Sequence, residues 1–424
     1  MIRRFAVHLA AALFLAGCAL AQSLSPASAD REALRARIDA QPTDYDSSFA
    51  YVRLSIEARD YEAAIGVLER MLTFNPALSR AHYELGSLYF RLASYAKAAR
   101  HYQAAATDPG LDPDLRARAA AYLPIAAKEL QTDRWYGLLM TGLRYNSNPG
   151  SEPSGSTLSA LGLLATGNGA KPAASAFALG DLRYVHEFGN ERGDTFEARA
   201  QGYAAKNFRN DDFDAGLADI VLGPKFRLPV GAASAIIVSP YVAASAAATG
   251  GGYRASTAGG GLSVRFPLSA FAYLEPGVEA RAVNVRDPAG FAAQGALNSG
   301  SLWSASLAAR VTPMDRVTID ARGHYARNST STSFLSSRQW GLQGSVKFDF
   351  EPPLAGLPLN WSFTPYARVV WTSFDAPNPF LFPGLVARRD MLTRLGAQLD
   401  MPVSVSFGFT ANVEHRNNHS NVAL

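Results

Sequence analysis

Few side chains in this sequence have the spacing that a catalytic or metal-binding site requires. His415 and His419 are four residues apart, but Arg416 stands where the zinc-protease pattern HExxH needs its glutamate. Asp320 and Arg322 fall on one face of an expected strand, a placement typical of an ion pair rather than of a catalytic acid and base. The sequence contains no serine-centred elbow, phosphate loop or cysteine cluster. We therefore expect no enzymatic activity, no cofactor and no metal site.

Cys18, the only cysteine, is the residue best placed for covalent modification. Leu15-Ala16-Gly17-Cys18 has the form of a bacterial lipobox, in which the thiol is acylated and the cysteine becomes the new N-terminus. Ala19-Leu20-Ala21 is equally a cleavage site for the ordinary signal peptidase, so both routes of processing remain open. With a single cysteine, an internal disulfide is excluded.

The first residues of the chain read as a secretion signal. Arg3 and Arg4 precede an apolar core from Phe5 to Ala16, and small residues follow. We expect residues 1–21 to be a signal peptide, which places the rest of the chain beyond the inner membrane.

Length and composition favour two domains of unequal size. A chain of 424 residues is too long for one ordinary domain. Hydrophobic residues make up 48% of it, the mean hydropathy is -0.03, and no stretch after the signal is apolar over the length that a membrane helix needs. Its Gly 35, Tyr 17, Phe 23 and Trp 5 suit a membrane barrel, although a soluble sandwich has a similar composition. The net charge of +4 is too small to indicate nucleic-acid binding.

Residues 30–131 read as pairs of helices with an internal period. Four positions recur one tetratricopeptide length, about 34 residues, further on: Tyr61, Ala64, Leu68 and Met71 return as Tyr95, Ala98, Tyr102 and Ala105. Over residues 45–109 the sequence resembles the tetratricopeptide repeat family, with Ala64, Pro76, Gly86 and Ala98 at its packing and turn positions. Residues 30–41 and 112–130 are expected as flanking helices, which predicts a helical solenoid within residues 22–133.

Such a solenoid offers a concave face that commonly holds a peptide from a partner. An array this short lies near the lower limit for stable stacking, so it is also consistent with a spacer or a plug for a barrel mouth. We expect a periplasmic protein partner, such as a lipoprotein.

From Arg134 onward the period changes to two residues. Around Val346 the apolar residues Trp340, Leu342, Val346, Phe348 and Phe350 alternate with Gln343, Ser345, Lys347 and Asp349. The same alternation places polar residues together on other strands, as in Glu197, Arg199 and Gln201, in Glu275, Glu279 and Arg281, and in Thr318, Asp320, Arg322 and His324. A soluble sandwich gives the same pattern, so alternation alone does not decide.

The connections between strands decide in favour of a barrel. Thirteen strands are expected, near 134–146, 175–188, 194–206, 214–228, 234–247, 257–267, 270–284, 301–312, 316–327, 335–350, 359–372, 390–400 and 403–415. Long polar links follow odd-numbered strands and short links follow even-numbered ones. This alternation is typical of an up-and-down outer-membrane barrel with long loops outside and short turns in the periplasm. We expect residues 134–424 to form a transmembrane antiparallel β-barrel in contact with outer-membrane lipids, and the helical domain to lie in the periplasm.

The odd strand count conflicts with the even counts of bacterial single-chain barrels. The chain ends at HRNNHSNVAL, where a fourteenth strand would begin. We therefore expect about fourteen strands, with the last one missing or with one strand split or merged in the assignment.

The N-terminal repeats, a first strand ending in Tyr145-Asn146-Ser147-Asn148, and the strand segment Leu222-Gly223-Pro224-Lys225-Phe226 together resemble the surface lipoprotein assembly modulators, the Slam family. The resemblance implies a fourteen-stranded barrel that helps to deliver lipoproteins from the periplasm to the cell surface. This chain departs from that pattern in its smaller helical domain and its absent last strand.

Two Ser-Asn pairs are expected at the outer rim: Ser147-Asn148 after the first strand, and Ser420-Asn421 where the last loop should turn into the closing strand. In a closed barrel these strands pair, which would place both Ser-Asn pairs beside the seam, as a rim or lateral gate. Ordinary turn chemistry of Ser and Asn explains the pairs equally.

Three functions remain open: a translocation or assembly factor for surface lipoproteins, an exopolysaccharide export porin with a repeat scaffold, and a passive structural barrel.

Overall fold

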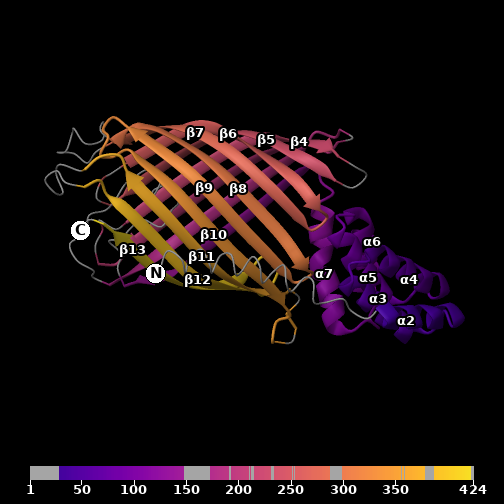
Figure 1. Cartoon of the computed structure of the whole chain (residues 1–424). Helices are drawn as coiled ribbons and strands as arrows, with labels where there is room; N and C mark the ends of the chain where they lie inside the picture. Colours follow the sequence, from indigo (N-terminus) through magenta and orange to yellow (C-terminus); the bar gives the residue numbers. More distant parts are fainter. Residues whose placement is uncertain are drawn as a thin grey trace.

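A computed structural model describes residues 28–147, 172–190, 192–209, 211, 214–230, 234–250, 252, 254–286, 298–354, 356–357, 359–377 and 386–421. In this part of the chain, six helices are followed by thirteen strands, and the helices gather at one end of a long curved sheet (Figure 1). The change from helix to strand falls between Lys128 and Asp133. The predicted order of helices followed by thirteen antiparallel strands is confirmed.

The helices repeat in pairs. Their bounds are α2 Ser28–Ala40, α3 Tyr45–Glu57, α4 Tyr61–Phe74, α5 Ser79–Arg91, α6 Tyr95–Thr107 and α7 Pro113–Lys128. The pair α5 and α6 begins 34 residues after the pair α3 and α4, at Ser79 against Tyr45 and at Tyr95 against Tyr61. Of the described helices, none combines the length and the apolar character needed to cross a bilayer.

Aspartate caps fix where three of these helices begin. The side chains of Asp44, Asp60 and Asp112 accept hydrogen bonds from backbone N–H groups of the first turns of α3, α4 and α7. Each cap satisfies a donor that has no partner within the helix, which is worth about 1 kcal/mol.

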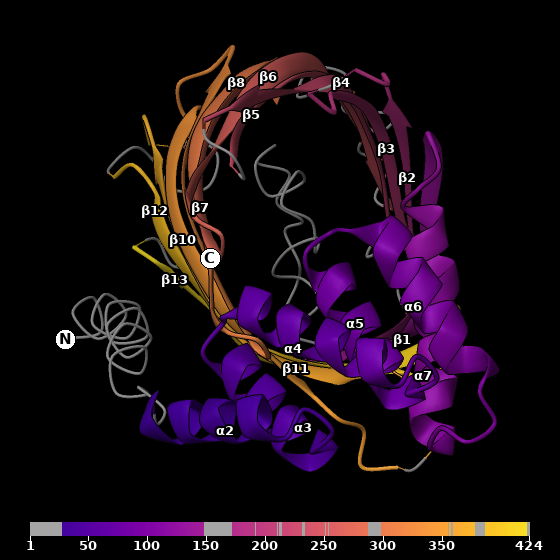
Figure 2. The same ribbon diagram turned by 90° about the vertical axis from the view of Figure 1, so that its right-hand side faces the viewer.

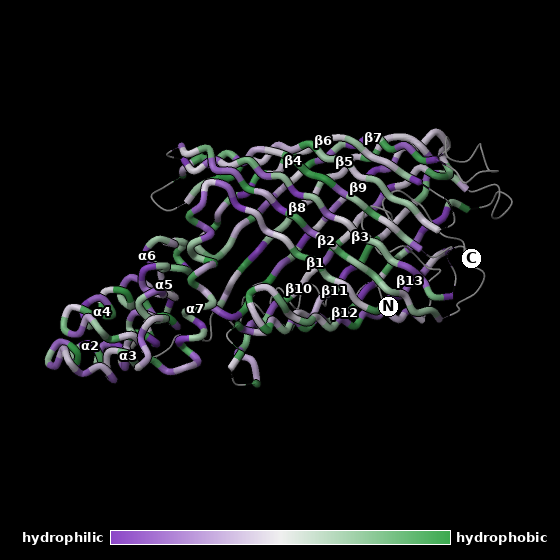
Figure 3. Tube along the Cα trace, turned by 180° about the vertical axis from the view of Figure 1, so that it is seen from behind, coloured by the Kyte–Doolittle hydropathy of each residue, from purple (hydrophilic) through white to green (hydrophobic). Residues whose placement is uncertain are grey.

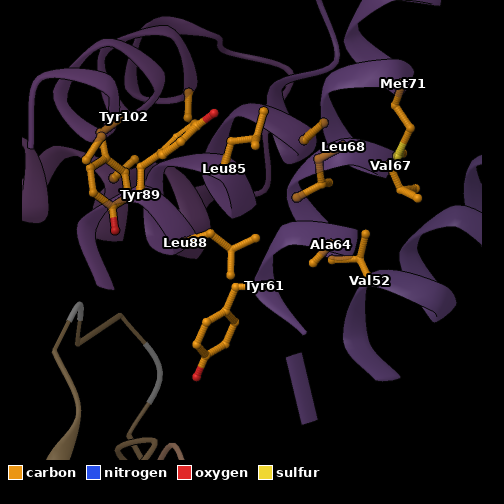
Figure 4. Packing of buried hydrophobic residues seen from close by; sticks show 14 of the residues in the cluster. Val52, Tyr61, Ala64, Val67, Leu68, Met71, Leu85, Leu88, Tyr89 and Tyr102 are labelled. Atoms are coloured by element: carbon orange, nitrogen blue, oxygen red, sulfur yellow. The ribbon is translucent and has the colours of Figure 1, made fainter. Parts of the chain in front are cut away.

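The helical domain has its own apolar core. Leu68, Met71 and Leu85 are almost fully buried, and Ala64 and Ala98 have no exposed surface (Figure 4). The small side chains occur where helices approach closely, so a larger residue would force them apart. Among the described residues, Phe271, in a turn of the sheet, is the hydrophobic residue from outside the helical domain that packs against this core.

Gly86 faces an aromatic side chain across the contact of α5 with α6. A Cβ atom added at Gly86 would lie 2.8 Å from Cδ1 of Tyr102. The Tyr102 ring stacks on Tyr122 with centroids 5.8 Å apart, so it has little room to move. The expected crowding at Gly86 therefore comes from the Tyr102 ring.

The turn inside each helix pair uses a left-handed backbone conformation. Arg59, after α3, has φ 60°, and Ala93, the corresponding residue after α5, has φ 55°. Glycine is the usual residue at this position, because side chains cost roughly 1 kcal/mol there. The equivalence of the two turns supports a repeated unit, while its assignment to the tetratricopeptide family stays a prediction.

The thirteen strands form one antiparallel sheet in which each strand pairs with the next along the chain. Figure 3 shows hydrophobic and hydrophilic residues alternating along them. The strand bounds are β1 Asp133–Asn146, β2 Ala173–Glu187, β3 Thr195–Asn207, β4 Ala215–Pro229, β5 Ala235–Thr249, β6 Arg254–Ser269, β7 Ala272–Arg286, β8 Gly300–Met314, β9 Val317–Thr330, β10 Ser337–Phe350, β11 Trp361–Phe374, β12 Arg389–Pro402 and β13 Gly408–Ser420.

The last strand begins five residues later than predicted. Residues 403–407 form the turn after β12, where the backbone N–H groups of Val403 and Ser404 both donate to the Phe407 carbonyl. The alternation of Val403, Val405 and Phe407 continues through this turn, so the pattern alone gave no stop signal.

The alternation of loop lengths is not strict. Ten residues separate β10 from β11 on the short-turn side, and four separate β5 from β6 on the other side. The longest connections still follow odd-numbered strands, after β1, β7 and β11.

The expected pairing of the first and last strands is not observed. Among the described residues, β1 and β13 are the two free edges of the sheet, so it curves without closing (Figure 2). In a meander all odd-numbered strands run in the same direction, so β1 and β13 are parallel. They therefore cannot complete the antiparallel ladder with each other.

Candidate functional site

Side-chain contacts across several strands identify the concave face of the sheet. Asp219 on β4 and Arg281 on β7 lie three strands apart, about 14 Å along a flat sheet, yet Asp219 Oδ1 and Arg281 Nη1 are 3.2 Å apart. Side chains can converge in this way only on the inside of a curved sheet. Tyr241 on β5 likewise reaches Glu279 on β7, with 3.0 Å between the oxygens.

The concave face is polar and carries many ion pairs. The polar sets predicted on β3, β7 and β9 all lie on it, because cross-strand register links them to Asp219 and Arg281. Its described ion pairs include Arg183–Glu197, Arg199–Asp181, Lys225–Glu197, Arg265–Glu275, Arg281–Glu279 and Arg310–Asp320. A wall of this kind suits a wet interior and is unlike the apolar inner face of a soluble sandwich.

The convex face is apolar and carries aromatic residues near both ends of the strands. At one end Tyr325 lies between Trp303 and Trp340, with ring centroids 5.6 and 4.5 Å away. At the other end Phe350 lies 6.4 Å from Trp361.

The two aromatic groups have the spacing of a membrane. Trp340 and Phe350 are ten positions apart on β10, roughly 34 Å along the strand. A strand tilt of about 40° reduces this to roughly 26 Å across a bilayer, which matches the apolar band of transmembrane barrels.

The helical domain docks on the turns at one end of the sheet. Phe271 lies in the turn between β6 and β7. The Arg59 guanidinium lies 3.8 Å from the centroid of the Phe271 ring, and the Tyr61 ring packs against Phe271 in a T-shaped arrangement with the two centroids 6.3 Å apart. Arg59 also donates a hydrogen bond to the Thr312 carbonyl near the end of β8. Arg59, whose backbone has the left-handed conformation, therefore contacts the sheet at two places.

A second contact surrounds Asp315, in the turn between β8 and β9. The Tyr61 hydroxyl donates to Asp315 Oδ1 at 2.8 Å, and Arg91 forms an ion pair with Oδ2. Burial, and the carboxylate beside it, raise the pKa of the Tyr61 hydroxyl. In Figure 4 the Tyr61 hydroxyl points away from the helical core.

The turn before β11 completes the interface. Glu351 lies 3.8 Å from Arg118 on α7 and 3.0 Å from Arg316 in the turn after β8. Turns after three even-numbered strands thus contact residues of α4, α5, α7 and the α3–α4 turn.

The connection between the two parts is short and held in place. Arg134 is 7% exposed, and its guanidinium donates to the carbonyls of Glu129 and Gln131 at 3.2 and 2.8 Å. It also contacts Glu187 on β2 at 3.3 Å. One buried guanidinium therefore ties the end of α7 to the first two strands.

The predicted packing residues lie within the helical domain. Ala64 is in α4, Gly86 in α5 and Ala98 in α6, all buried, while Pro76 lies exposed in the turn before α5. The Pro76 carbonyl contacts Nε2 of His82 at 3.0 Å, a local turn contact.

The rim residues lie at the same end of the sheet, on its opposite edges. Ser147 is exposed just after β1, and Ser420 ends β13. The Asn421 side chain accepts from the Arg389 N–H at 2.6 Å and donates to the Ala387 carbonyl at 3.1 Å. Asn421 thus caps the start of β12. Asn148 and Cys18 lie outside the described residues.

Phe271 and Asp315 were not recognised from the sequence. Phe271 occupies a turn of two residues between Ser269 and Ala272, where an aromatic side chain has no local role. That mismatch was the available signal, but its partners Arg59 and Tyr61 are more than two hundred residues away in the chain.

Comparison with known proteins gives fold likeness only. No protein-family model and no curated relative matches the chain. Among solved structures, Acinetobacter baumannii OccAB4 shares 9% identity with a TM-score of 0.30, covering 69% of this chain and 95% of its own. Salmonella typhi OmpF, in complex with Daunomycin, shares 8% identity with a TM-score of 0.27, covering 68% and 97%. These neighbours are outer-membrane porins, and the likeness is too distant to transfer a function.

Proposed function

We propose that the protein is an outer-membrane β-barrel that acts as a translocation or assembly factor, with its helical domain at the periplasmic mouth. The observation that carries the proposal is the pairing of a polar concave face with an apolar convex face bounded by two aromatic groups. Only a bilayer makes such an outer face stable without further protein.

Membrane location is tested by fractionation and gel mobility. We expect the full chain in the outer-membrane fraction, with different mobility in unheated and boiled samples because folded barrels resist detergent. Recovery from the soluble periplasm, with the same mobility before and after boiling, would remove the basis of the proposal.

The proposed orientation is supported by the secretion signal and by the place where the helices dock. Helices that follow a cleaved signal are delivered to the periplasm, and they contact the turns after even-numbered strands. We expect protease added to intact cells to spare residues 28–132 and protease added to spheroplasts to cut them. Cleavage in intact cells would reverse the orientation.

The more specific proposal is delivery of lipoproteins to the cell surface, recruited through the helical domain. It is supported by the Slam-like segments, by the position of the helices across one mouth of the barrel, and by the polar wall behind them. Partner recruitment at a mouth requires that the helices stay docked, which gives a direct genetic test.

The test is surface display of a co-expressed lipoprotein, read by protease shaving of whole cells. Arg91→Gln removes the ion pair with Asp315 and should reduce display. The matched control is Arg70→Gln, whose ion pair with Asp39 lies within the helical domain, and it should leave display unchanged. Display that does not depend on the protein at all would contradict lipoprotein delivery while leaving the membrane barrel intact.

A further inference from the structure

The convex face of the sheet carries its positive charge at one end. Alternate positions of each strand belong to this face, and the cross-strand register fixes which ones. At the end near the helices, the convex positions of the described strands include no lysine or arginine. At the far end (Figure 1), within three residues of where the strand begins or ends, they include Lys206, Arg254, Arg286, Arg327, Arg338 and Arg389.

Three of these arginines lie at one level on neighbouring strands. Arg327 on β9 is opposite Arg338 on β10, and Arg338 is opposite Ser373 on β11. Ser373 is in turn opposite Arg389 on β12. We call Arg327, Arg338 and Arg389 the arginine line.

An aromatic line runs parallel to the arginine line, two positions further into each strand. Tyr325, Trp340 and Trp371 are opposite one another on β9, β10 and β11. Two positions correspond to roughly 7 Å along a strand. In membrane barrels, aromatic residues lie at the boundary between acyl chains and headgroups. The arginine line is therefore at the level of the lipid headgroups.

The arginine line has a net positive charge. Among the described residues, its ion pairs involve one carboxylate, Asp375, which accepts from Arg327 Nη1 at 2.8 Å and lies 3.6 Å from Arg338 Nε. The Arg338 side chain is 61% exposed, and Arg389 is also exposed. Three guanidinium groups beside one carboxylate give a positive surface, and basic groups at the surface of a bilayer attract anionic lipids.

We propose that the arginine line binds the phosphate groups of a phosphorylated lipid in the leaflet distant from the helical domain. The guanidinium group matches phosphate through paired N–H donors, and the aromatic line gives the acyl chains of the same lipid an apolar surface. The proposal rests on the membrane barrel of the proposed function, but it does not depend on translocation.

The span of the arginine line favours a headgroup with two phosphate groups. Three strand spacings separate β9 from β12, roughly 14 Å across the sheet. Side chains diverge on a convex surface, so one phosphate group cannot contact Arg327 and Arg389 together. A sugar headgroup that carries two phosphates extends over such a span, so we infer a bisphosphorylated glycolipid.

The test is native mass spectrometry of the detergent-solubilised full chain with two probe lipids, bisphosphorylated lipid A and its monophosphorylated form. The two probes share their acyl chains, so a difference in retention reports the phosphate. We expect the bisphosphorylated form to be retained several-fold more strongly. Millimolar inorganic phosphate should not displace it, because free phosphate has no acyl chains to contact the aromatic line.

Four variants identify the residues that recognise the phosphate. Arg338→Gln and Arg389→Gln should each lower the preference for the bisphosphorylated lipid several-fold. Arg322→Gln, which removes an exposed arginine from the concave face of β9, is the matched control and should leave the preference unchanged. Asp375→Asn removes the carboxylate of the line and should strengthen retention, a gain that misfolding does not produce.

Three results would overturn the proposal. Equal retention of both lipids by the parent protein would mean that it does not recognise the second phosphate. A preference unchanged in Arg338→Gln and Arg389→Gln would place recognition elsewhere. Displacement by inorganic phosphate would mean that the site binds soluble phosphate instead of a lipid. Gel mobility separates these results from failure of the proposed function, because a barrel that resists detergent but shows no lipid preference contradicts the lipid site alone.

Discussion

Adding a single methyl group at Gly86 tests the packing of the helical domain. In Gly86→Ala, the new Cβ would lie 2.8 and 2.9 Å from two carbons of the Tyr102 ring. Carbon atoms prefer about 3.5–4.0 Å, so the ring would have to move by roughly 0.7 Å. Tyr102 is 2% exposed and is packed against Phe90 and Tyr122, which resist that movement.

Two opposing effects set the magnitude. Replacing glycine by alanine inside a helix gains about 1 kcal/mol of helix propensity, while overpacking a buried site costs about 1–3 kcal/mol. We expect a net loss of roughly 1 kcal/mol, which lowers the melting temperature of a domain of this size by about 4–8 °C.

Gly66→Ala is the matched control, because Gly66 also lies inside a helix but a Cβ there meets nothing within 4 Å. It should raise the melting temperature by about 4–8 °C, since only the propensity gain acts. The assay is the helical circular-dichroism signal of the full chain on heating, with gel mobility reporting the barrel. If both variants stabilise the helices equally, the Tyr102 ring does not limit the site and the reasoning is wrong.

Three further perturbations test the turn, the strand register and the half-buried His101. Arg59→Gly should relieve about 1 kcal/mol of backbone strain yet free the helical domain from the turns, seen as faster hydrogen exchange across the interface. Ala93→Gly should relieve the same strain with docking unchanged, and equal exchange in the two variants would refute the role of Arg59. Val346→Arg should destabilise the folded state in the membrane by about 2–4 kcal/mol and block membrane assembly, whereas Ser345→Arg should be tolerated. Similar damage from both substitutions would show that the assignment of the two faces is wrong. Burial lowers the pKa of His101 to about 4 from its ordinary 6.5, so the unfolded chain takes up the proton first and the helices should lose stability as pH falls from 6.5 to about 4. Urea denaturation at several pH values measures the free energy of unfolding. If this free energy varies with pH in His101→Gln as it does in the parent protein, His101 is not the cause of the pH dependence.

The regular elements could be predicted from the sequence because each has a short-range period. Ala64 and Ala98 mark one repeat length, and the described helices begin and end close to the predicted positions. The alternation around Val346 predicted that Ser345 and Lys347 lie on the polar face of the sheet. The strand register places both on the concave side.

Features that depend on distant parts of the chain could not be predicted. Because the strand count is odd, the edge strands β1 and β13 run parallel. The expectation that the sheet closes into a barrel rested on comparison with barrels that have an even number of strands. Docking of Arg59 on Phe271 depends on the folded curvature of seven strands.

The short connection pinned by Arg134 determines how the helices meet their docking surface. Four residues lie between Lys128 and Asp133, so the Cα atoms of these two residues can be at most about 18 Å apart. A tether of this length keeps the two surfaces at an effective concentration on the order of millimolar or higher. Even a weak set of contacts is then occupied most of the time. Anything held by the helices is therefore delivered to the mouth of the barrel at a local concentration that its own abundance does not set.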